Sequence, residues 1–230
     1  MKWRSLEESF PQSETRSLRE IYEGRKALNE KYVPADVRAI HARVVAELKQ
    51  SAISERSLKP GDAAPSFELP DQNGKIVRSA DLLRRGPLVV FFIRGRWCPF
   101  CVAQVQSMND AAPIIRSRGA ELVAISPHTV HQNFLMADQH KLSFLLLSDL
   151  GTKVAFQYGL TYQVPDDQKE IYRRAFVNLP FLNGDESWVL PIPATYILAK
   201  SGSIVYAWSD PDYAVRPEPA EIAEFLSSLI

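Results

Sequence analysis

An uninterrupted apolar run, Leu88 to Ile93 (Leu-Val-Val-Phe-Phe-Ile), limits the folds that are open to this chain. The run has the length of a strand and is too short for a helix that crosses a domain. Because it has no polar residue at alternate positions, the strand it predicts is covered on both faces. Such strands lie in sheets with helices on both sides, so the run predicts an α/β protein.

Strand-like and helical segments alternate along the rest of the chain. Further strands are expected at 66–69, 121–126, 144–147, 195–198 and 203–208, and helices at 99–117, 130–140, 153–158 and 218–229. This alternation predicts a central sheet flanked by helices. A polar and aromatic insert at 161–190 interrupts the rhythm. Its aromatic residues are expected in the core, or as a wall beside a substrate or a second subunit: Tyr162, Tyr172, Phe176, Phe181 and Trp188.

The first 57 residues differ from the rest because they carry helical periodicity and no strand signal. Apolar residues recur at helical spacing before and after Pro34, a residue that is favoured at the start of a helix. We therefore expect a helical arm over residues 1–57 and an α/β domain over 58–230. The arm can pack on that domain or on a second copy of the chain, so a homodimer is one of the two arrangements expected.

Charge and hydropathy exclude several classes of function. Lys and Arg together number 27, as do Asp and Glu, so nothing favours a nucleic acid or an anionic membrane surface as a partner. No apolar stretch approaches the roughly 18 residues of a membrane span. The first twenty residues are charged and show no signal-peptide pattern, so a cytoplasmic protein is expected.

The two cysteines, Cys98 and Cys101, follow directly on the apolar strand. Pro99 favours a helix that begins there, which puts Cys98 at the helix N-terminus, where the helix dipole lowers the pKa of a thiol. Arg94 and Arg96 add positive charge nearby. Cys101 lies one helical turn further on, within reach of Cys98. The spacing therefore predicts a pair of cysteines that exchange electrons.

Two other interpretations of the pair are less favoured. Inert packing is unusual for two cysteines at this spacing after a strand. A zinc site requires four ligands, and only His128 and His131 suggest themselves. Both histidines follow a strand end, and we expect them to be solvated loop residues.

A proline further along supports the redox interpretation. Pro193 precedes the strand at 195–198, and an X–Pro bond is cis at modest cost. Beside a redox-active cysteine pair we expect Pro193 to be a cis-proline. Trp97 is expected to shape the pocket or to pack beside the strand.

These residues resemble the thioredoxin superfamily, whose Trp-Cys-x-x-Cys motif is matched by Trp97 to Cys101, with Pro193 at the position of the facing cis-proline. The chain is more closely similar to the alkyl hydroperoxide reductase/thiol-specific antioxidant (peroxiredoxin) family, over about residues 57–226. Within the family, the chain is similar to the bacterial branch with an Arg-Gly-x-Trp-Cys-Pro-[Tyr/Phe]-Cys signature. The residues that carry the resemblance are 61–70, 122–127, 146–149, 158–160, 190–198 and 210–213. It implies a thioredoxin-like fold: a central mixed β-sheet flanked by helices, here with an N-terminal helical extension.

The two resemblances assign the cysteines opposite roles. On the peroxiredoxin pattern Pro-x-x-x-[Thr/Ser]-x-x-Cys, Cys101 is the attacking residue, while Cys98 replaces the Thr/Ser and Arg94 replaces the proline. On the thioredoxin pattern Cys98 attacks and Cys101 resolves. We expect Cys98 to attack, because Cys101 lies a turn further into the helix and should be less exposed.

The resemblance implies a thiol-dependent peroxidase that reduces hydrogen peroxide or organic hydroperoxides through a Cys98–Cys101 disulfide. No cofactor is implied, and an external thiol, of the thioredoxin or glutathione type, would be the reductant. An alternative is a thiol–disulfide oxidoreductase that acts on protein or small-molecule disulfides. A third is a redox-sensing binding module in which the disulfide controls an interaction of the arm.

Overall fold

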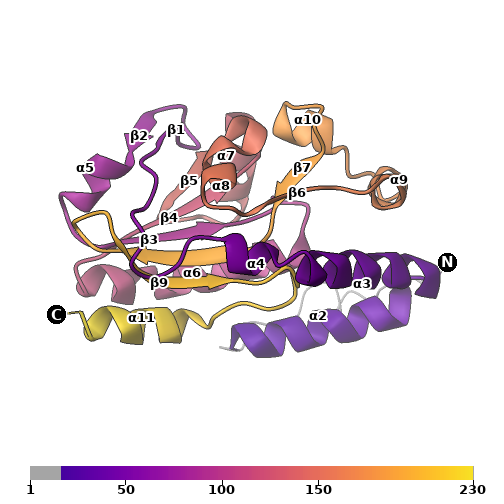
Figure 1. Cartoon of the computed structure of the whole chain (residues 1–230), viewed down its shortest axis with the longest axis horizontal. Helices are drawn as coiled ribbons and strands as arrows, with labels where there is room; N and C mark the ends of the chain where they lie inside the picture. The colour runs from indigo at the N-terminus through magenta and orange to yellow at the C-terminus, as the bar shows by residue number, and fades with distance from the viewer. Residues whose placement is uncertain (1–16, 230) are drawn as a thin grey trace.

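A five-stranded mixed sheet forms the centre of the protein in the computed structural model, which describes residues 17–229 (Figure 1). The strand order is β5-β4-β3-β8-β9, with β3 (Leu88–Phe92) in the middle. Strand β3 runs parallel to β4 (Glu121–Ser126), which is parallel to β5 (Leu145–Ser148). On its other side β3 pairs antiparallel with β8 (Ala194–Leu198), which pairs with β9 (Ile204–Ser209). The expected mixed sheet with flanking helices is thus confirmed.

The remaining elements surround this sheet. Two small antiparallel sheets are formed by β1 (Glu68–Pro70) with β2 (Ile76–Arg78) and by β6 (Thr161–Gln163) with β7 (Val189–Pro191). The helices are α2 (Leu18–Tyr32), α3 (Ala35–Gln50), α4 (Ile53–Arg56), α5 (Ser79–Leu83), α6 (Pro99–Ser117), α7 (Val130–Gln139), η1 (Leu150–Thr152), α8 (Lys153–Gln157), α9 (Asp166–Arg174), α10 (Leu179–Asn183) and α11 (Pro219–Ser227). No helix between residues 17 and 229 is both long and apolar enough to cross a membrane.

The apolar run in β3 divides its side chains between two cores, because successive side chains of a strand point to opposite faces. Val89 and Phe91 pack under α6, α11 and α2. Leu88, Val90 and Phe92 pack on the opposite face, against residues of β1, α5 and α8. All five residues of β3 are fully buried. This explains why the run has no polar alternation.

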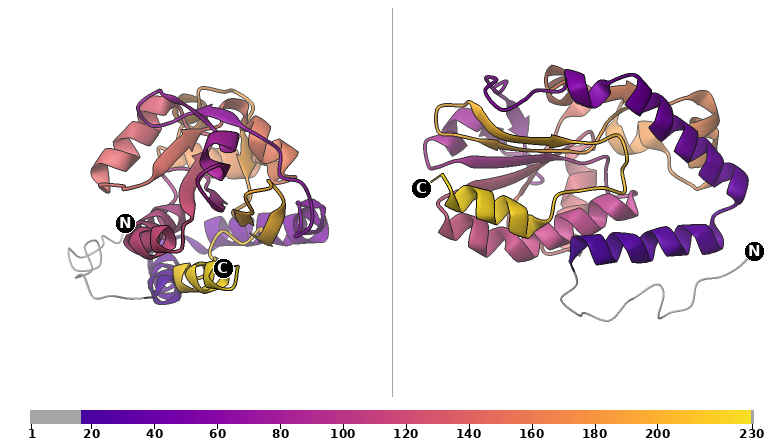
Figure 2. Two further views of the ribbon diagram at one scale, coloured as in Figure 1. Left: turned by 90° about the vertical axis from the view of Figure 1, so that its left-hand side faces the viewer. Right: turned by 60° about the horizontal axis from the view of Figure 1, so that its bottom comes forward.

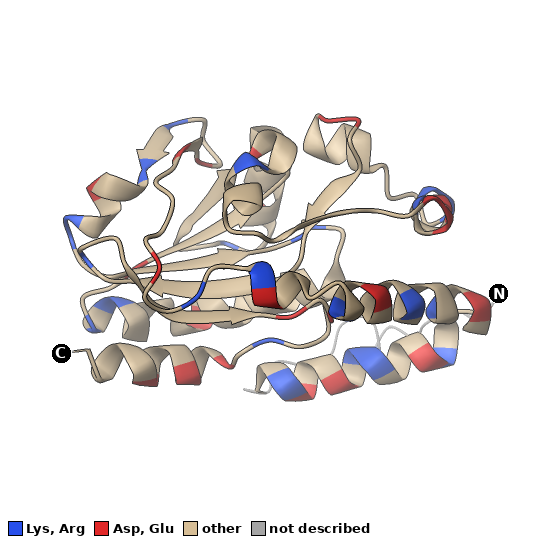
Figure 3. Ribbon diagram, viewed as in Figure 1, with Lys and Arg blue, Asp and Glu red and all other residues tan. Residues whose placement is uncertain are grey.

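The helical arm packs against the domain of the same chain. Helix α2 lies alongside α6, and α11 lies against α6 as well (Figure 2). Charged residues recur along α2 and α3, whereas the central strands are nearly free of them (Figure 3). Helix α3 begins at Ala35, directly after Pro34, as the sequence predicts. The part of the expected arm that precedes residue 17 lies outside the described residues.

The insert at 161–190 has a core of its own, formed by α9, α10 and the β6–β7 sheet. Its buried residues are Val164, Tyr172, Leu179, Leu182, Trp188 and Leu190. Two of its aromatic side chains, Phe176 and Phe181, are instead largely exposed, so the expectation of a core position is wrong for them. Trp97 packs against this small core and joins it to the domain.

The N-terminus of α2 has a capping box formed by Ser17 and Glu20, and a further carboxylate reaches it from 200 positions along the chain. The Glu218 carboxylate accepts from the backbone N–H groups of Leu18 (3.0 Å) and Arg19 (2.7 Å), at the positive end of the helix dipole. This contact fastens the arm to the segment that leads into α11.

We expect Glu218→Ala to lower the free energy of unfolding by about 0.3–1 kcal/mol, the usual range for a carboxylate at a helix N-terminus, because the capping box of Ser17 and Glu20 remains. Chemical denaturation measures this change. Glu224→Ala, which removes an exposed carboxylate from α11, is the control and should have little effect. Equal stability of the two variants would contradict the capping role of Glu218.

Candidate active site

The cysteines lie where β3 ends and α6 begins, as the sequence predicts. Cys98 is the N-cap residue of α6, and Pro99 occupies the first turn. The Cys98 carbonyl accepts from the Val102 N–H (3.0 Å), and the Cys98 N–H donates to the Gly95 carbonyl (3.2 Å), which closes the loop. Cys101 lies one turn further along the same helix.

Both thiols are reduced and almost completely buried, with 2% of Cys98 and none of Cys101 exposed. The two thiols interact: the contact with Cys101 raises the pKa of Cys98, and the contact with Cys98 lowers the pKa of Cys101. The expected proximity of the two sulfurs is therefore present. The expected difference in exposure, on which the choice of Cys98 as the attacking thiol rested, is nearly absent.

The pKa values of the two thiols are shifted in opposite directions. Burial raises the pKa of the Cys98 thiol well above its usual value, and the hydrogen bond to Cys101 raises it further. Burial also raises the pKa of Cys101, but the hydrogen bond from Cys98 and the charges of Arg216 and Arg94 outweigh that effect and lower it to about 5. The expectation that Cys98 has the lowered pKa is wrong. At Cys98 the cost of burying a charge exceeds the benefit of the helix N-terminus and of Arg94.

Arg216 is a charged side chain close to Cys101 that the sequence did not predict. Its Nη2 lies 3.9 Å from the Cys101 Sγ, and its Nε donates to the Gln104 Oε1 (2.8 Å). A second guanidinium nitrogen donates to the Tyr213 carbonyl (3.0 Å), so the group is held on several sides. The segment after β9 has the sequence of a simple turn, and no local motif links it to a cysteine 115 positions earlier.

The two arginines before Cys98 differ in where they point. Arg94 is buried between the rings of Trp97 (4.7 Å) and Tyr213 (4.8 Å), and donates to the Tyr172 hydroxyl. Its charge acts on both thiols. The Arg96 side chain instead donates to the Gln132 Oε1 on α7 (2.7 Å). Arg94 thus occupies the site, and Arg96 fixes the loop to α7.

The arm covers the first turn of α6. Tyr22 of α2 is buried, donates its hydroxyl to the Phe100 carbonyl (2.7 Å) and packs edge-on against the Phe100 ring (5.1 Å between centroids). Tyr213 packs on the other side of Phe100 (5.5 Å). Trp97 and Tyr172 also contact each other (5.0 Å). Aromatic rings therefore pack around the first turn of α6, and Trp97 packs among them.

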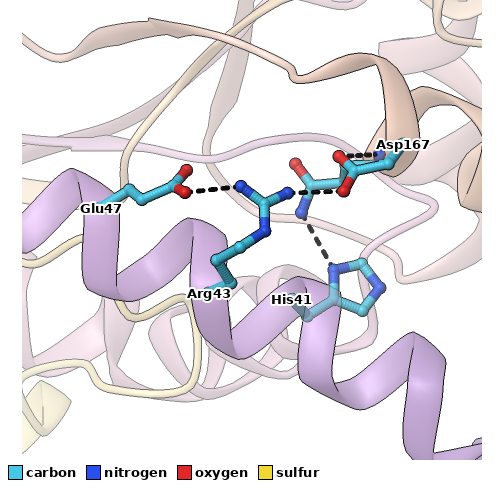
Figure 4. A network of polar contacts seen from close by, with 5 residues as sticks. His41, Arg43, Glu47 and Asp167 are labelled. Atoms are coloured by element: carbon cyan, nitrogen blue, oxygen red, sulfur yellow. Dashed lines mark hydrogen bonds and ion pairs between the residues drawn. The ribbon is translucent and has the colours of Figure 1, made fainter.

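Helix α3 holds the insert against this enclosure (Figure 4). Arg43 forms ion pairs with Glu47 and with Asp167 of α9 (2.6 Å each), and His41 shares a hydrogen bond with Gln168 (3.0 Å). The His41 ring lies 6.0 Å from that of Tyr172. Burial and the Arg94 charge lower the pKa of His41 to about 4, so this histidine is neutral near pH 7.

Pro193 is buried and next to the site, but it is not a cis-proline. All peptide bonds between residues 17 and 229 are trans, so that expectation is wrong. The chain runs from β7 through Ile192 and Pro193 into β8. Between these two strands, the Ile192 N–H donates a hydrogen bond to the Leu160 carbonyl (2.8 Å). Phe92 pairs with Ala194, which puts Pro193 beside the end of β3 that leads to the cysteines.

The two histidines after β4 have different surroundings. His131 is exposed, as expected. His128 is completely buried, so its assignment as a solvated loop residue is wrong. Within residues 17–229, no three His, Cys, Asp or Glu side chains come together as a metal site would require.

Comparison with known proteins agrees with this geometry. The model of the AhpC/TSA family matches residues 60–207, which begin after the arm. The chloroplastic peroxiredoxin Q of Sedum lineare is 32% identical over 165 residues, 72% of this chain and 76% of that protein. The chloroplastic peroxiredoxin Q of Oryza sativa subsp. japonica is 31% identical over 169 residues, 74% of this chain and 67% of that protein.

Solved structures share the fold. The crystal structure of peroxidoxin BcpB from Mycobacterium tuberculosis superposes with a TM-score of 0.58 at 24% identity, over 75% of this chain and 98% of that one. Peroxiredoxin Q from Xanthomonas campestris gives a TM-score of 0.52 at 18% identity, over 71% of this chain and 89% of that one. The chain therefore belongs to the AhpC/TSA family and has the thioredoxin fold of the peroxiredoxins.

Proposed function

We propose that the protein is a thiol-dependent peroxidase in which Cys101 attacks the peroxide and Cys98 resolves the product. The observation that carries this assignment is the environment of Cys101. Its sulfur lies 3.9 Å from the Arg216 Nη2, and the Cys98 thiol, Arg216 and Arg94 together lower its pKa to about 5. A thiol with that pKa is almost wholly thiolate near pH 7, which is the nucleophilic form.

The cycle consists of one oxidation by the peroxide, one condensation between the two cysteines and one reduction by an external thiol. The Cys101 thiolate attacks one oxygen of the peroxide, the O–O bond breaks, and the other oxygen leaves as an alcohol or water once protonated. Cys101 is then a sulfenic acid. The Cys98 thiol attacks that sulfur, which forms the Cys98–Cys101 disulfide and releases water. Two electrons from an external thiol restore the pair.

Burial supports a small oxidant over a protein disulfide as the substrate. Attack on a disulfide requires a sulfur of the substrate in line with the attacking thiolate, and neither cysteine has more than 2% of its surface exposed. Hydrogen peroxide or a small organic hydroperoxide needs far less room. We further propose an external thiol of the thioredoxin or glutathione type as the reductant, and no cofactor beyond the cysteine pair.

Serine substitutions test which thiol attacks. We expect Cys101→Ser to abolish the reaction with hydrogen peroxide in stopped-flow measurements. Cys98→Ser should react once at a rate within about tenfold of the wild type, because serine keeps a hydrogen-bond donor to Cys101. It should then stop as a sulfenic acid, which a 1,3-dione reagent traps and mass spectrometry detects.

The reverse result, a reactive Cys101→Ser and an inert Cys98→Ser, would assign the attack to Cys98. A wild-type protein that reacts with peroxide no faster than free cysteine would refute the peroxidase function itself.

Removing the charge of Arg216 tests what lowers the pKa of Cys101. In the wild type the thiolate fraction, and with it the rate with peroxide, should rise through about pH 5 and level off above it. In Arg216→Gln the thiolate loses a nearby cation, so we expect its pKa to rise by roughly one unit or more. The ultraviolet absorbance of the thiolate measures the pKa directly. Arg118→Gln, at an exposed site, is the control, and an unchanged titration in Arg216→Gln would contradict this role.

A further inference from the structure

His128 lies between the loop that carries Cys98 and helix α10. Its Nδ1 hydrogen-bonds to the Asn183 Oδ1 (2.8 Å), and its Nε2 accepts from the backbone N–H of Arg96 (3.0 Å). An amide oxygen only accepts, so the proton of the ring is on Nδ1 and Nε2 is free to accept. Asn183 therefore selects the tautomer that binds the loop.

The same ring is also a surface against which the loop backbone packs. Gly95 has φ +136°, and a Cβ built there would lie 2.3 Å from the His128 Cε1 and 2.4 Å from its Nε2. A larger residue would collide with the imidazole, and the backbone angle itself favours glycine. The imidazole thus contacts two successive residues, Gly95 through packing and Arg96 through a hydrogen bond.

These two residues separate the functional groups of the site. Arg94 immediately precedes them, and Cys98, which lowers the pKa of Cys101, follows two residues later. We propose that His128 is a positioning residue for the peroxidase reaction: its imidazole, oriented by Asn183, fixes the loop that aligns Arg94 and Cys98 with Cys101. The inference rests on the proposed function and extends it to a residue that touches neither thiol.

The positioning role requires the neutral ring. A proton on Nε2 would face the Arg96 N–H and break the bond to the loop. Arg96 is the charged group that acts on the ring, and α10 contributes the uncharged side chain of Asn183. Burial and Arg96 lower the pKa of His128 to about 4, so the ring stays neutral throughout the range in which Cys101 is a thiolate.

Substitutions at His128 separate positioning from packing. We expect His128→Leu, which leaves the Arg96 N–H without its acceptor, to slow the reaction with hydrogen peroxide by roughly 10- to 100-fold through misalignment. His128→Gln restores an acceptor oxygen and should recover most of that loss. His131→Leu is the matched control at an exposed position of the neighbouring helix. A wild-type rate in His128→Leu, or no recovery in His128→Gln, would overturn the proposal.

A charge at Asn183 tests the role of the neutral ring. In Asn183→Asp the carboxylate still accepts from Nδ1 but stabilises the imidazolium, which raises the pKa of His128 by roughly 1–3 units. We expect the peroxide rate to gain an acid limb above pH 5, while the thiolate absorbance of Cys101 still titrates near pH 5. A rate profile that keeps following the thiolate titration, as in the wild type, would contradict the requirement for a neutral imidazole.

Amide hydrogen exchange of Arg96, followed by NMR in the reduced protein, makes the test independent of turnover. Exchange should accelerate in His128→Leu, and in Asn183→Asp as the pH falls, but not in His131→Leu. Unchanged exchange in both variants refutes the positioning role even if the wild type is an active peroxidase. If the wild type shows no turnover but exchange is accelerated in the variants, the proposed peroxidase function is refuted, while the hydrogen bond between His128 and the Arg96 N–H is supported.

Discussion

The active site depends on a balance of charge in a buried space. Arg94 and Arg216 are both buried, and no ion pair found between residues 17 and 229 includes either of them. Burying a cation without a partner is costly, and aromatic faces and carbonyl groups offset only part of that cost. In the proposed mechanism, the Cys101 thiolate is the anion that completes the balance. The electrostatic interaction that lowers the pKa of Cys101 is thus the same one that offsets the cost of burying the two arginines.

The helical arm is part of the site. Tyr22 covers the first turn of α6, and His41 and Arg43 hold α9, whose Tyr172 accepts from Arg94. The α/β domain alone would leave this region open to water. Water would screen the arginines and weaken their effect on Cys101, because electrostatic interactions are strongest where solvent is excluded. The arm precedes the residues that the family model matches, and by excluding water it strengthens the effect of the two arginines on Cys101.

Local patterns predicted the features that depend on neighbours in the sequence. The apolar run marked the central strand, Pro99 marked the start of α6, and the spacing of the cysteines put the two thiols together. The acidity of each thiol did not follow, because a helix N-terminus is only one contribution beside burial and distant charges. Arg216 reaches Cys101 across 115 positions and His128 reaches Arg96 across 32, and neither contact has a local signature. Pro193 likewise matched the position of a cis-proline in the sequence, but its peptide bond is trans.

The unpaired arginines also bear on what happens after the thiols are oxidised. Formation of the disulfide removes the negative charge and leaves two guanidinium groups buried without a counter-ion. The electrostatic energy of the site thus favours the dithiol form, as it does in strongly oxidising dithiol proteins whose reduced state is stabilised. The proposed disulfide therefore has a reduction potential that favours its reduction by an external thiol.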